Sequence, residues 1–318
     1  MVSDLQSQYS ESNIVCLAGG VGGAKLAEGL AQIVLPDRLT VIVNTGDDFQ
    51  HLGLTICPDL DTVTYTLGGV ANPKTGWGRL GESWVTVGEV ERLGGPDWFR
   101  LGDLDLATHL VRSQRLAEGE RLTAVTRHLC KKFGILARVL PMSDQAAPTM
   151  IETDNGLLPF QSWFVRERWQ PAVREVCLPA DVRATPQVMH ALENADFVII
   201  APSNPFVSID PILNVYPIRE MVMDLPRAVL AVTPIIGDKA LKGPAAKMMA
   251  EMNLPVSAAA VAGHYGDLID GFVIDQQDRA QVNNLNCAVL ASNTIMNEGP
   301  DRVRLAVEVL DFARQITN

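Results

Sequence analysis

Paired cysteines are missing from the sequence, since none of its five cysteines occurs in a C-x-x-C arrangement. Widely spaced thiols exclude a disulfide framework or a zinc-binding knuckle, and they are typical of reduced side chains in the cytoplasm. The cysteines are Cys16, Cys57, Cys130, Cys177 and Cys287.

Positive charge is also in short supply. The chain has 26 Lys and Arg residues against 37 Asp and Glu residues, which gives a net charge of −11. This balance excludes a broad basic surface for nucleic acid or for an anionic membrane. No apolar run reaches the roughly 18 residues that cross a bilayer, and residues 1–13 form a polar tail without the apolar core of a secretory signal. We expect a cytoplasmic protein whose partners are small molecules.

What the chain does contain is buried strands joined by helices. Residues 14–18 and 39–43 are short apolar runs of the parallel-strand type. Leu26, Leu30 and Ile33 recur between them at helical spacing. This strand–helix–strand unit predicts an α/β fold with a Rossmann-like, doubly wound and mostly parallel sheet.

The pattern returns later in strands over 197–201, 228–232 and 272–275 and in a closing helix over 303–314. The middle differs, because it predicts two helices (106–116 and 122–133) and a β-hairpin over 149–165 that turns at Asn155-Gly156. We therefore expect one domain over 14–318, with an inserted helical and hairpin region at about 64–180 that covers the ligand side of the sheet.

A glycine-rich turn, Ala18-Gly19-Gly20-Val21-Gly22-Gly23-Ala24-Lys25, follows the first strand. Its spacing fits neither the dinucleotide fingerprint nor the P-loop, since Lys25 and Ala24 stand where glycines belong. Two interpretations stay open: a turn whose backbone amides and lysine bind phosphate, or a close-packed connection without a ligand.

Four carboxylates fall within fifteen residues, in Asn44-Thr45-Gly46-Asp47-Asp48 and Pro58-Asp59-Leu60-Asp61-Thr62. We interpret both segments as acidic turns at the carboxyl ends of neighbouring strands, where open α/β sheets bind ligands. Aspartate also caps helices and forms turns, which is the alternative. Clustered carboxylates repel one another without a cation, so we favour metal binding for Asp48 and Asp61 and, less so, for Asp47 and Asp59.

Polar loops follow the later strands as well. Ser203, Asn204 and Thr233, in loops over 202–205 and 233–237, offer hydrogen bonds to phosphate or sugar.

Asp103 or Asp105 is a candidate cap for the helix that carries His109. Aromatic residues gather in the loops before it, where they either pack in the core or flank a flat heteroaromatic ligand. They are Trp77, Trp84, Trp98 and Phe99.

These motifs together resemble the 2-phospho-L-lactate transferase family, in order from about Ile14 to Asp278. Further matching segments are Leu101-Gly102-Asp103-x-Asp105-Leu106-Ala107-Thr108-His109, Leu140-Pro141-Met142-Ser143-Asp144 and Pro202-Ser203-Asn204-Pro205. The resemblance implies a magnesium-dependent enzyme of coenzyme F-420 biosynthesis that is usually a homodimer. It transfers a phospholactyl group, or the phosphoenolpyruvyl or phosphoglyceryl equivalent, from a guanosine diphosphate-linked donor to the ribityl hydroxyl of the deazaflavin Fo, and GMP leaves.

The resemblance also implies residue roles. Asp48 and Asp61 would be the catalytic residues and the Mg²⁺ ligands, with Asp61 also near the acceptor, and Arg100 would contact Fo. The donor would be bound by residues of the glycine turn, the first acidic turn and the later loops. These are Gly20, Gly22, Lys25, Asn44, Ser203, Asn204, Thr233 and Gly237.

Two other functions stay open. A non-catalytic regulator that binds nucleotide sugars belongs to the same superfamily and shares the glycine turn, but lacks the Pro-Asp-Leu-Asp-Thr segment found here at 58–62. A nicotinamide oxidoreductase would share the strand–helix–strand start. It is disfavoured because Asn44 stands at the tip of the second strand, where an acidic residue would bind the ribose.

Overall fold

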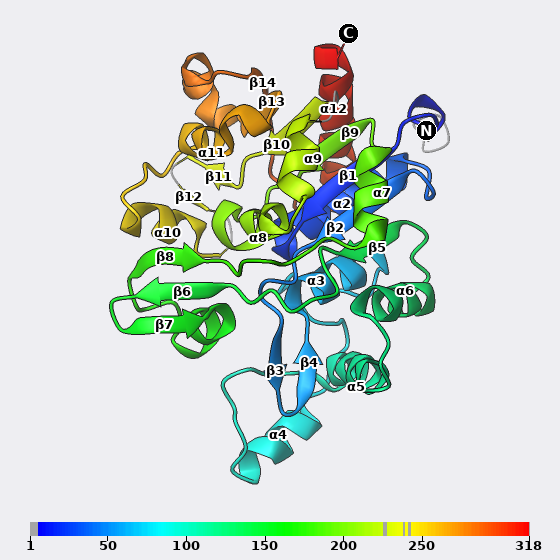
Figure 1. Cartoon of the computed structure of the whole chain (residues 1–318), viewed down its shortest axis with the longest axis vertical. Coiled ribbons are helices and arrows are strands. Elements are labelled where there is room, and N and C mark those ends of the chain that lie inside the picture. Colours follow the sequence, from blue (N-terminus) through cyan, green and yellow to red (C-terminus); the bar gives the residue numbers. More distant parts are fainter. Residues whose placement is uncertain (1–5, 225–227, 238, 241–242, 318) are drawn as a thin grey trace.

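The computed structural model describes residues 6–224, 228–237, 239–240 and 243–317. Within these residues, seven strands form one sheet in the order β14-β13-β10-β9-β1-β2-β5, and every neighbouring pair is parallel (Figure 1). The predicted doubly wound parallel sheet is therefore confirmed. The strands are β1 (Ile14–Ala18), β2 (Leu39–Val43), β5 (Arg138–Pro141), β9 (Phe197–Ile200), β10 (Ala228–Val232), β13 (Gly271–Asp275) and β14 (Ala288–Ser292).

Helices cover both faces of this sheet. Since successive side chains of a strand point to opposite sides, each strand contributes to two apolar cores. In β1, Ile14 and Cys16 belong to one apolar core, whereas Val15 and Leu17 belong to the other. The first core includes α2 (Gly20–Ile33), α3 (Pro58–Leu67), α6 (Leu122–Lys132) and α12 (Gly299–Thr317). The second includes α7 (Pro186–Glu193), α8 (Asp210–Asn214), α9 (Ile218–Asp224), α10 (Ala245–Glu251) and α11 (Ala258–Tyr265).

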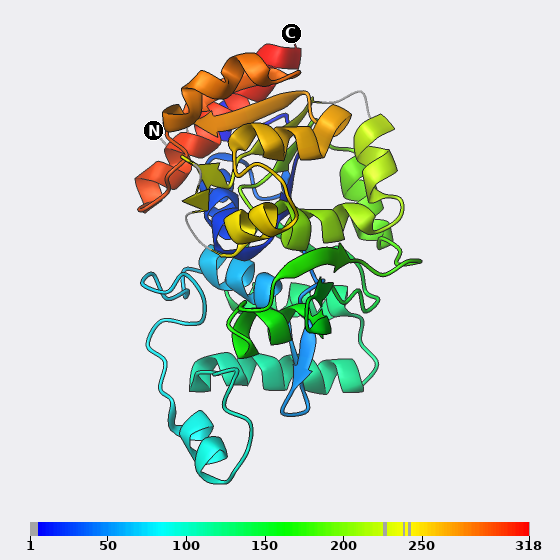
Figure 2. The ribbon, with the colours of Figure 1, turned by 90° about the vertical axis from the view of Figure 1, so that its left-hand side faces the viewer.

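The region predicted as an insertion leaves the sheet and returns to it. β5 pairs with β2 as an edge strand of the central sheet, so 64–180 contains one core strand. Within it, α4 lies at the far tip of a segment that extends away from the sheet (Figure 2), whereas α6 packs against the sheet. The extended segment includes α4 (Val85–Arg92) and α5 (Asp103–Ala117). The hairpin of β3 (Phe49–His51) and β4 (Leu54–Ile56) precedes the predicted insertion and packs beside α5, where the Thr55 amide donates to Ser113 at 2.8 Å.

The predicted Asn-Gly hairpin is present. β6 (Met150–Thr153) pairs antiparallel with β7 (Gly156–Pro159), and Gly156 has a φ of +104° at the turn. The second strand is shorter than expected, because the chain leaves the sheet after Pro159 and forms a π-helical turn over Ser162–Arg166. Trp163 in this turn is fully buried and donates its Nε1 hydrogen to the Pro171 carbonyl at 2.9 Å.

Three further strands and three further helical turns are present among the described residues. β8 (Val173–Cys177) is the third strand of the small sheet, beside β6. The others are β11 (Ile235–Ile236), β12 (Lys239–Ala240), η2 (Pro205–Ile209), η3 (Gly266–Leu268) and η4 (Gln276–Asn284).

The segment predicted as a polar tail packs onto α12. Tyr9 is fully buried, its hydroxyl donates to Asp311 at 2.7 Å, and the Arg314 guanidinium lies 4.5 Å from its ring centre. Residues 1–5 of that tail lie outside the described residues. Among the helices that the structure describes, none has the length and apolarity needed to cross a membrane.

Candidate active site

The loops after β1 and β9 meet at the centre of the sheet. The chain passes from β1 to β2 on one side, while β9 flanks β1 on the other, so this is the point where the strand order reverses. Ligands of open α/β sheets bind in such crevices. Ser203 joins the two loops, because its hydroxyl donates to the Gly19 carbonyl at 2.7 Å and accepts from the Gly19 amide at 3.1 Å.

The glycine turn is already engaged by protein groups. Gly20 has a φ of +62° and donates its amide hydrogen to Asp59 at 2.7 Å. A Cβ on Gly22 would lie 2.2 Å from the Pro202 carbonyl oxygen, so close packing accounts for that glycine. Lys25 donates to the Met296 carbonyl in the loop after β14. These contacts favour the close-packed interpretation of the turn.

The second acidic segment is not a turn after a strand of the central sheet, and that prediction was wrong. Residues 58–62 form the first turn of α3, which follows the β3–β4 hairpin. Pro58 suits the first helical position because it needs no amide donor there, and Asp59 and Asp61 are favoured near the positive end of the helix dipole.

Asn44, at the end of β2, connects the two acidic segments. Its Nδ2 donates to Asp59 at 2.9 Å and to the Val207 carbonyl at 3.2 Å, and its Oδ1 accepts from the Gly46 amide at 2.7 Å. The side chain is fully buried. In this structure Asn44 therefore positions the carboxylates of the cluster.

The carboxylates of this cluster are costly to ionise together. Burial raises the pKa of Asp59 to about 6, against hydrogen bonds from Asn44 and Gly20. Burial, and then the charges of Asp59 and Asp48, raise the pKa of Asp47 well above its usual value. Burial likewise raises the pKa of Asp48, although a hydrogen bond with the Cys57 thiol and the charge of Arg112 oppose it. A cation at this position would relieve the repulsion.

Asp48 is the carboxylate best suited to hold a cation. Its Oδ1 is buried without a hydrogen-bond partner among the described residues, and the same holds for the hydroxyl of Thr45. By contrast, Asp47 accepts from Gln161 at 3.1 Å, and Asp59 accepts from Asn44 and Gly20. Carboxylate and hydroxyl oxygens are the ligands that magnesium prefers, so these residues fit the predicted ion.

Asp61 lies in a different environment from Asp48. Both of its oxygens accept from Arg112, one of them at 3.0 Å, and His109 Nδ1 lies 3.6 Å from it. His109 Nε2 is 3.2 Å from Asp105, which also accepts from the Tyr65 hydroxyl at 2.6 Å. Asp61, Asp105 and His109 are close enough to hold a metal.

Sequence reasoning missed Arg112. It stands one helical turn after His109 on α5, so the spacing of i and i+3 was the available signal. Its partner on α3 could not be identified without the packing of the two helices.

The expected helix caps are also different. Glu82 accepts from the first amides of α5, while Asp103 accepts from those of Val85 and Thr86 at the start of α4.

Aromatic side chains cluster directly beside the acidic site. Phe49 follows Asp48 in the chain and packs edge-on against Phe99, with ring centres 4.8 Å apart. His51 packs against Trp98 at 5.2 Å. Burial lowers the pKa of His51, and its Nε2 is buried without a hydrogen-bond partner among the described residues.

Arg100, the predicted Fo contact, is exposed one residue beyond this cluster. Its guanidinium lies 5.4 Å from the centre of the Trp84 ring, which is itself exposed. Trp77 and Trp84 are 51% and 41% exposed, whereas Trp98 and Phe99 are partly buried. The four aromatics predicted as a group are therefore separated. Trp98 and Phe99 belong to the aromatic cluster, whereas Trp77 and Trp84 lie in the extended segment around α4, which we call the arm (residues 70–102).

The polar residues of the later loops form their own turns. Asn204 accepts from the Phe206 amide at 3.0 Å, and Thr233 accepts from the Ile235 amide at 3.1 Å. Gly237 has a φ of +52° and donates to Asp278 at 3.1 Å. These loops lie after β9 and β10, and their hydrogen bonds fix their shape.

The fold and the site define a class: a doubly wound parallel α/β protein with a buried carboxylate cluster where the strand order reverses. The chain belongs to the 2-phospho-L-lactate transferase (CofD) family, whose model matches residues 14–303. It is thus a transferase of the coenzyme F-420 biosynthesis family, as the sequence motifs indicated, and differs from the nicotinamide oxidoreductases that the first βαβ unit also allowed.

Relatives with two different names cover nearly the whole chain. A phosphoenolpyruvate transferase of Thermobifida fusca is 44% identical over 319 residues, with 95% of this chain and 98% of the relative covered. A 2-phospho-L-lactate transferase of Methanosarcina mazei is 37% identical over 298 residues, with 92% and 98% covered. The solved protein BH3568 of Bacillus halodurans has a TM-score of 0.64 at 15% identity, with 94% and 99% covered, which supports the fold alone.

Proposed function

We propose that the protein transfers a phosphoenolpyruvyl group from a guanosine diphosphate-linked donor to the ribityl hydroxyl of Fo. A phosphorus–oxygen bond forms between the acceptor oxygen and the phosphate that carries the enolpyruvyl group. The bond from that phosphate to GMP breaks, and the hydroxyl proton goes to solvent or to a nearby base. The phosphoenolpyruvyl group is our first choice because a phosphoenolpyruvate transferase of Thermobifida fusca is 44% identical over 319 residues. A 2-phospho-L-lactate transferase of Methanospirillum hungatei is 41% identical over only 272 residues. Phospholactyl and phosphoglyceryl donors are the alternatives.

The observation that carries the proposal is the partnerless, buried Oδ1 of Asp48 among ionisable neighbours. Asp48 would hold Mg²⁺ together with Asp61, whose carboxylate has lone pairs beyond those used by Arg112. A bound magnesium ion would neutralise the diphosphate of the donor. Arg112 would keep Asp61 in a fixed orientation while the acceptor binds.

The donor would lie over the reversal point of the sheet. Gly20, Gly22 and Lys25 would border its phosphates, with Asn44 and Ser203 beneath. Asn204, Thr233 and Gly237 would shape the pocket for the nucleoside. The polar groups of Asn204, Thr233 and Gly237 form hydrogen bonds within the protein, so these three residues would act mainly by holding the loops in shape.

The acceptor would bind on the aromatic side. The rings of Phe49, Trp98 and Phe99 can stack on a deazaflavin, the unpartnered Nε2 of His51 can accept or donate a hydrogen bond, and Arg100 can close over it. We further propose that the protein is a homodimer, which light scattering of the purified protein would test.

The experiment that tests this function is a competition among donors. Purified protein would be mixed with Fo, Mg²⁺ and equal amounts of the phosphoenolpyruvyl, phospholactyl and phosphoglyceryl forms of the donor. The mass of the deazaflavin product identifies the group transferred, and we expect the enolpyruvyl product with stoichiometric GMP. Donor binding without a deazaflavin product would instead favour the non-catalytic nucleotide-sugar-binding regulator.

A further inference from the structure

We propose that the protein has a second anion-binding site, at the opposite end of the sheet from the carboxylate cluster, for a small phosphorylated ligand. A cavity of about 210 Å³ lies between the starts of β1, β2 and β5 and the last turn of α7. The five residues of β1, at about 3.3 Å each, separate it from the glycine turn by roughly 16 Å. Its lining includes Asn13, Arg38, Thr40, Arg138, His190 and Asn194.

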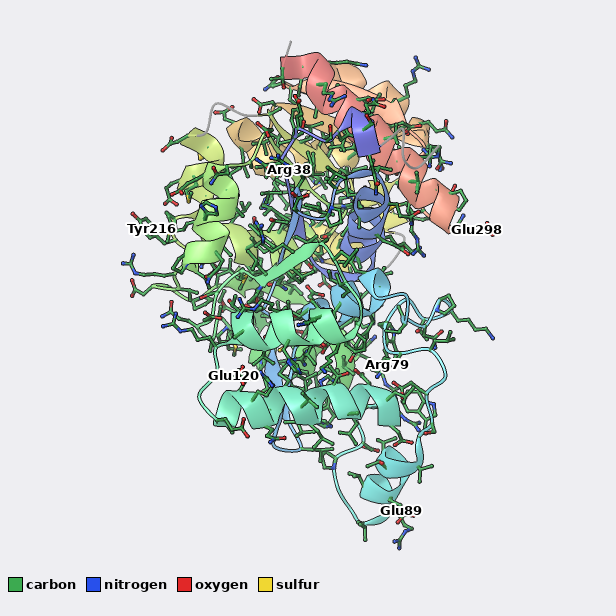
Figure 3. All side chains as sticks on the ribbon, turned by 90° about the vertical axis from the view of Figure 1, so that its right-hand side faces the viewer. Arg38, Arg79, Glu89, Glu120, Tyr216 and Glu298 are labelled. Carbon is green, nitrogen blue, oxygen red and sulfur yellow. The ribbon has the colours of Figure 1, made fainter. Side chains whose placement is uncertain are left out.

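Two arginines line this cavity because of the strand register. Thr40 of β2 pairs with Arg138 of β5, and Arg38 comes two residues before Thr40, so both arginines lie at the amino ends of these neighbouring strands. Figure 3 labels Arg38 in the part of the molecule that carries the sheet, far from the α4 arm marked by Glu89.

Among the described residues, each of these two arginines uses one N–H donor in a printed contact, which leaves most of their donors for a ligand. Arg38 donates to Asn13 Oδ1 at 3.1 Å, and Arg138 donates to Thr40 Oγ1 at 3.2 Å. Neither forms an ion pair with a described carboxylate. Asp37 also lines the cavity and balances only one of the two charges; Asp37 and Arg138 are exposed, whereas Arg38 is half-buried. Each guanidinium has five N–H donors, arranged to bind phosphate or carboxylate in a bidentate way.

Other polar groups hold the cavity in shape. Asn13 accepts from Arg38 and donates its Nδ2 hydrogen to the Asn194 carbonyl at 2.9 Å, which connects the start of β1 to the end of α7. Asn194 Nδ2 lies 3.2 Å from His190 Nδ1. Asn194 Nδ2 also donates to the His190 carbonyl at 2.8 Å, which holds the two side chains together at the end of α7.

The size of the cavity limits the ligand. Pockets for drug-sized ligands measure roughly 300–1,000 Å³, so a cavity of about 210 Å³ suits a smaller molecule. Ile14, Val15 and Ala191 supply an apolar floor next to the cationic wall. This combination fits a phosphate group with at most a few carbon atoms attached. The ligand is therefore inorganic phosphate or a small phosphorylated acid.

Arginine modification read residue by residue tests the site without interference from the catalytic centre. The full-length protein would be treated with phenylglyoxal in the presence of increasing inorganic phosphate, and modified arginines located by peptide mass spectrometry. We expect Arg38 and Arg138 to be protected with one common half-saturation concentration. Arg127, exposed on α6, serves as the internal control and should stay unprotected. Equal modification of Arg38 and Arg138 with and without phosphate would overturn the proposal.

Variants separate this site from the proposed transfer. Arg38→Gln should weaken phosphate protection of Arg138 at least tenfold, while Arg127→Gln should leave it unchanged. Protection of Arg138 that persists in Arg38→Gln would overturn the shared site. Phosphoenolpyruvate as a second probe identifies the source: tighter protection than by inorganic phosphate indicates a phosphorylated acid, and equal protection indicates free phosphate. All of these readouts remain valid if the protein proves to have no transferase activity on Fo.

Discussion

Arg112 and Asp61 form a buried, two-pronged ion pair, in which both terminal nitrogens of the guanidinium donate to the carboxylate. The pair joins α5 to the first turn of α3 inside a site otherwise dominated by aspartates. Asp61 is thus the one aspartate of the cluster whose charge is balanced by a bonded cation among the described residues. Asp48, with its partnerless oxygen, is left to bind an added ion.

Removing the charge of Asp61 should reduce stability as well as activity. Asp61→Asn leaves the buried Arg112 uncompensated, and breaking such a pair costs about 3–5 kcal/mol. Urea denaturation would measure this loss. The control, Glu89→Gln, breaks the exposed Arg92–Glu89 pair and should change the free energy of unfolding by about 0–1 kcal/mol. Equal effects of the two variants would show that Asp61 is not paired as described.

Asp48→Asn should separate activity from stability. The amide keeps the shape of the side chain and removes a costly buried charge, so the protein should unfold at the same temperature or higher. Turnover should fall by roughly 10²–10³-fold, the range seen when one electrostatic group of an active site is lost. Asp97→Asn, an exposed change on the arm, is the control and should retain turnover. Normal turnover in Asp48→Asn would exclude Asp48 from catalysis.

Two glycine-to-alanine changes should have opposite effects. In Gly22→Ala, the new methyl group would meet the Pro202 carbonyl oxygen at 2.2 Å, and we expect a loss of about 1–3 kcal/mol in unfolding free energy. In Gly88→Ala, within α4, the methyl group meets nothing within 4 Å, and helix propensity should add about 1 kcal/mol. Urea denaturation of both variants checks the signs, and a neutral Gly22→Ala would show that the loop after β9 can retreat.

Protonation of Asp103 at low pH should destabilise the start of α4, whose first amides donate to this carboxylate. Hydrogen bonds from Ser83 and Thr86 lower its pKa to about 2, below its ordinary value of 3.8. The folded state therefore binds the proton less readily than the unfolded chain, so this stabilisation is present above about pH 4 and is lost as the pH falls towards 2. Hydrogen exchange of the α4 amides between pH 4 and 2 measures the loss. In Asp103→Asn, exchange should already be fast at pH 4 and vary less with pH.

Five of the seven strands of the central sheet, β1, β2, β9, β10 and β13, were predictable because they are almost uniformly apolar. Residues 14–18 and 39–43 can be buried on both faces only in a parallel sheet covered by helices. The two edge strands, β5 and β14, were not predicted. β5 is only four residues long and starts with the exposed Arg138, and the residues of β14 are partly buried or exposed, so both give a weak pattern.

The site was predictable in part. Asp48 and Asn44 lie at the end of β2 as expected, because a strand's end fixes the position of the residues after it. The segment 58–62 was misassigned because proline and aspartate are favoured both in turns and at the start of helices. The caps of α4 and α5 were missed for another reason: Asp103 and Glu82 each cap the helix on the other side of the loop. Such contacts depend on tertiary packing, which local patterns do not encode.

The most direct test of the account is magnesium-dependent release of GMP by the wild-type protein and by Asp48→Asn. Both would be incubated with Fo and the phosphoenolpyruvyl donor while Mg²⁺ is titrated, and GMP and the deazaflavin phosphodiester would be quantified together. We predict saturable, one-to-one formation of both products by the wild-type protein, none in EDTA, and almost none by a folded Asp48→Asn variant. Equal product formation with EDTA, or by both proteins, would contradict the claim that this carboxylate cluster holds the catalytic cation.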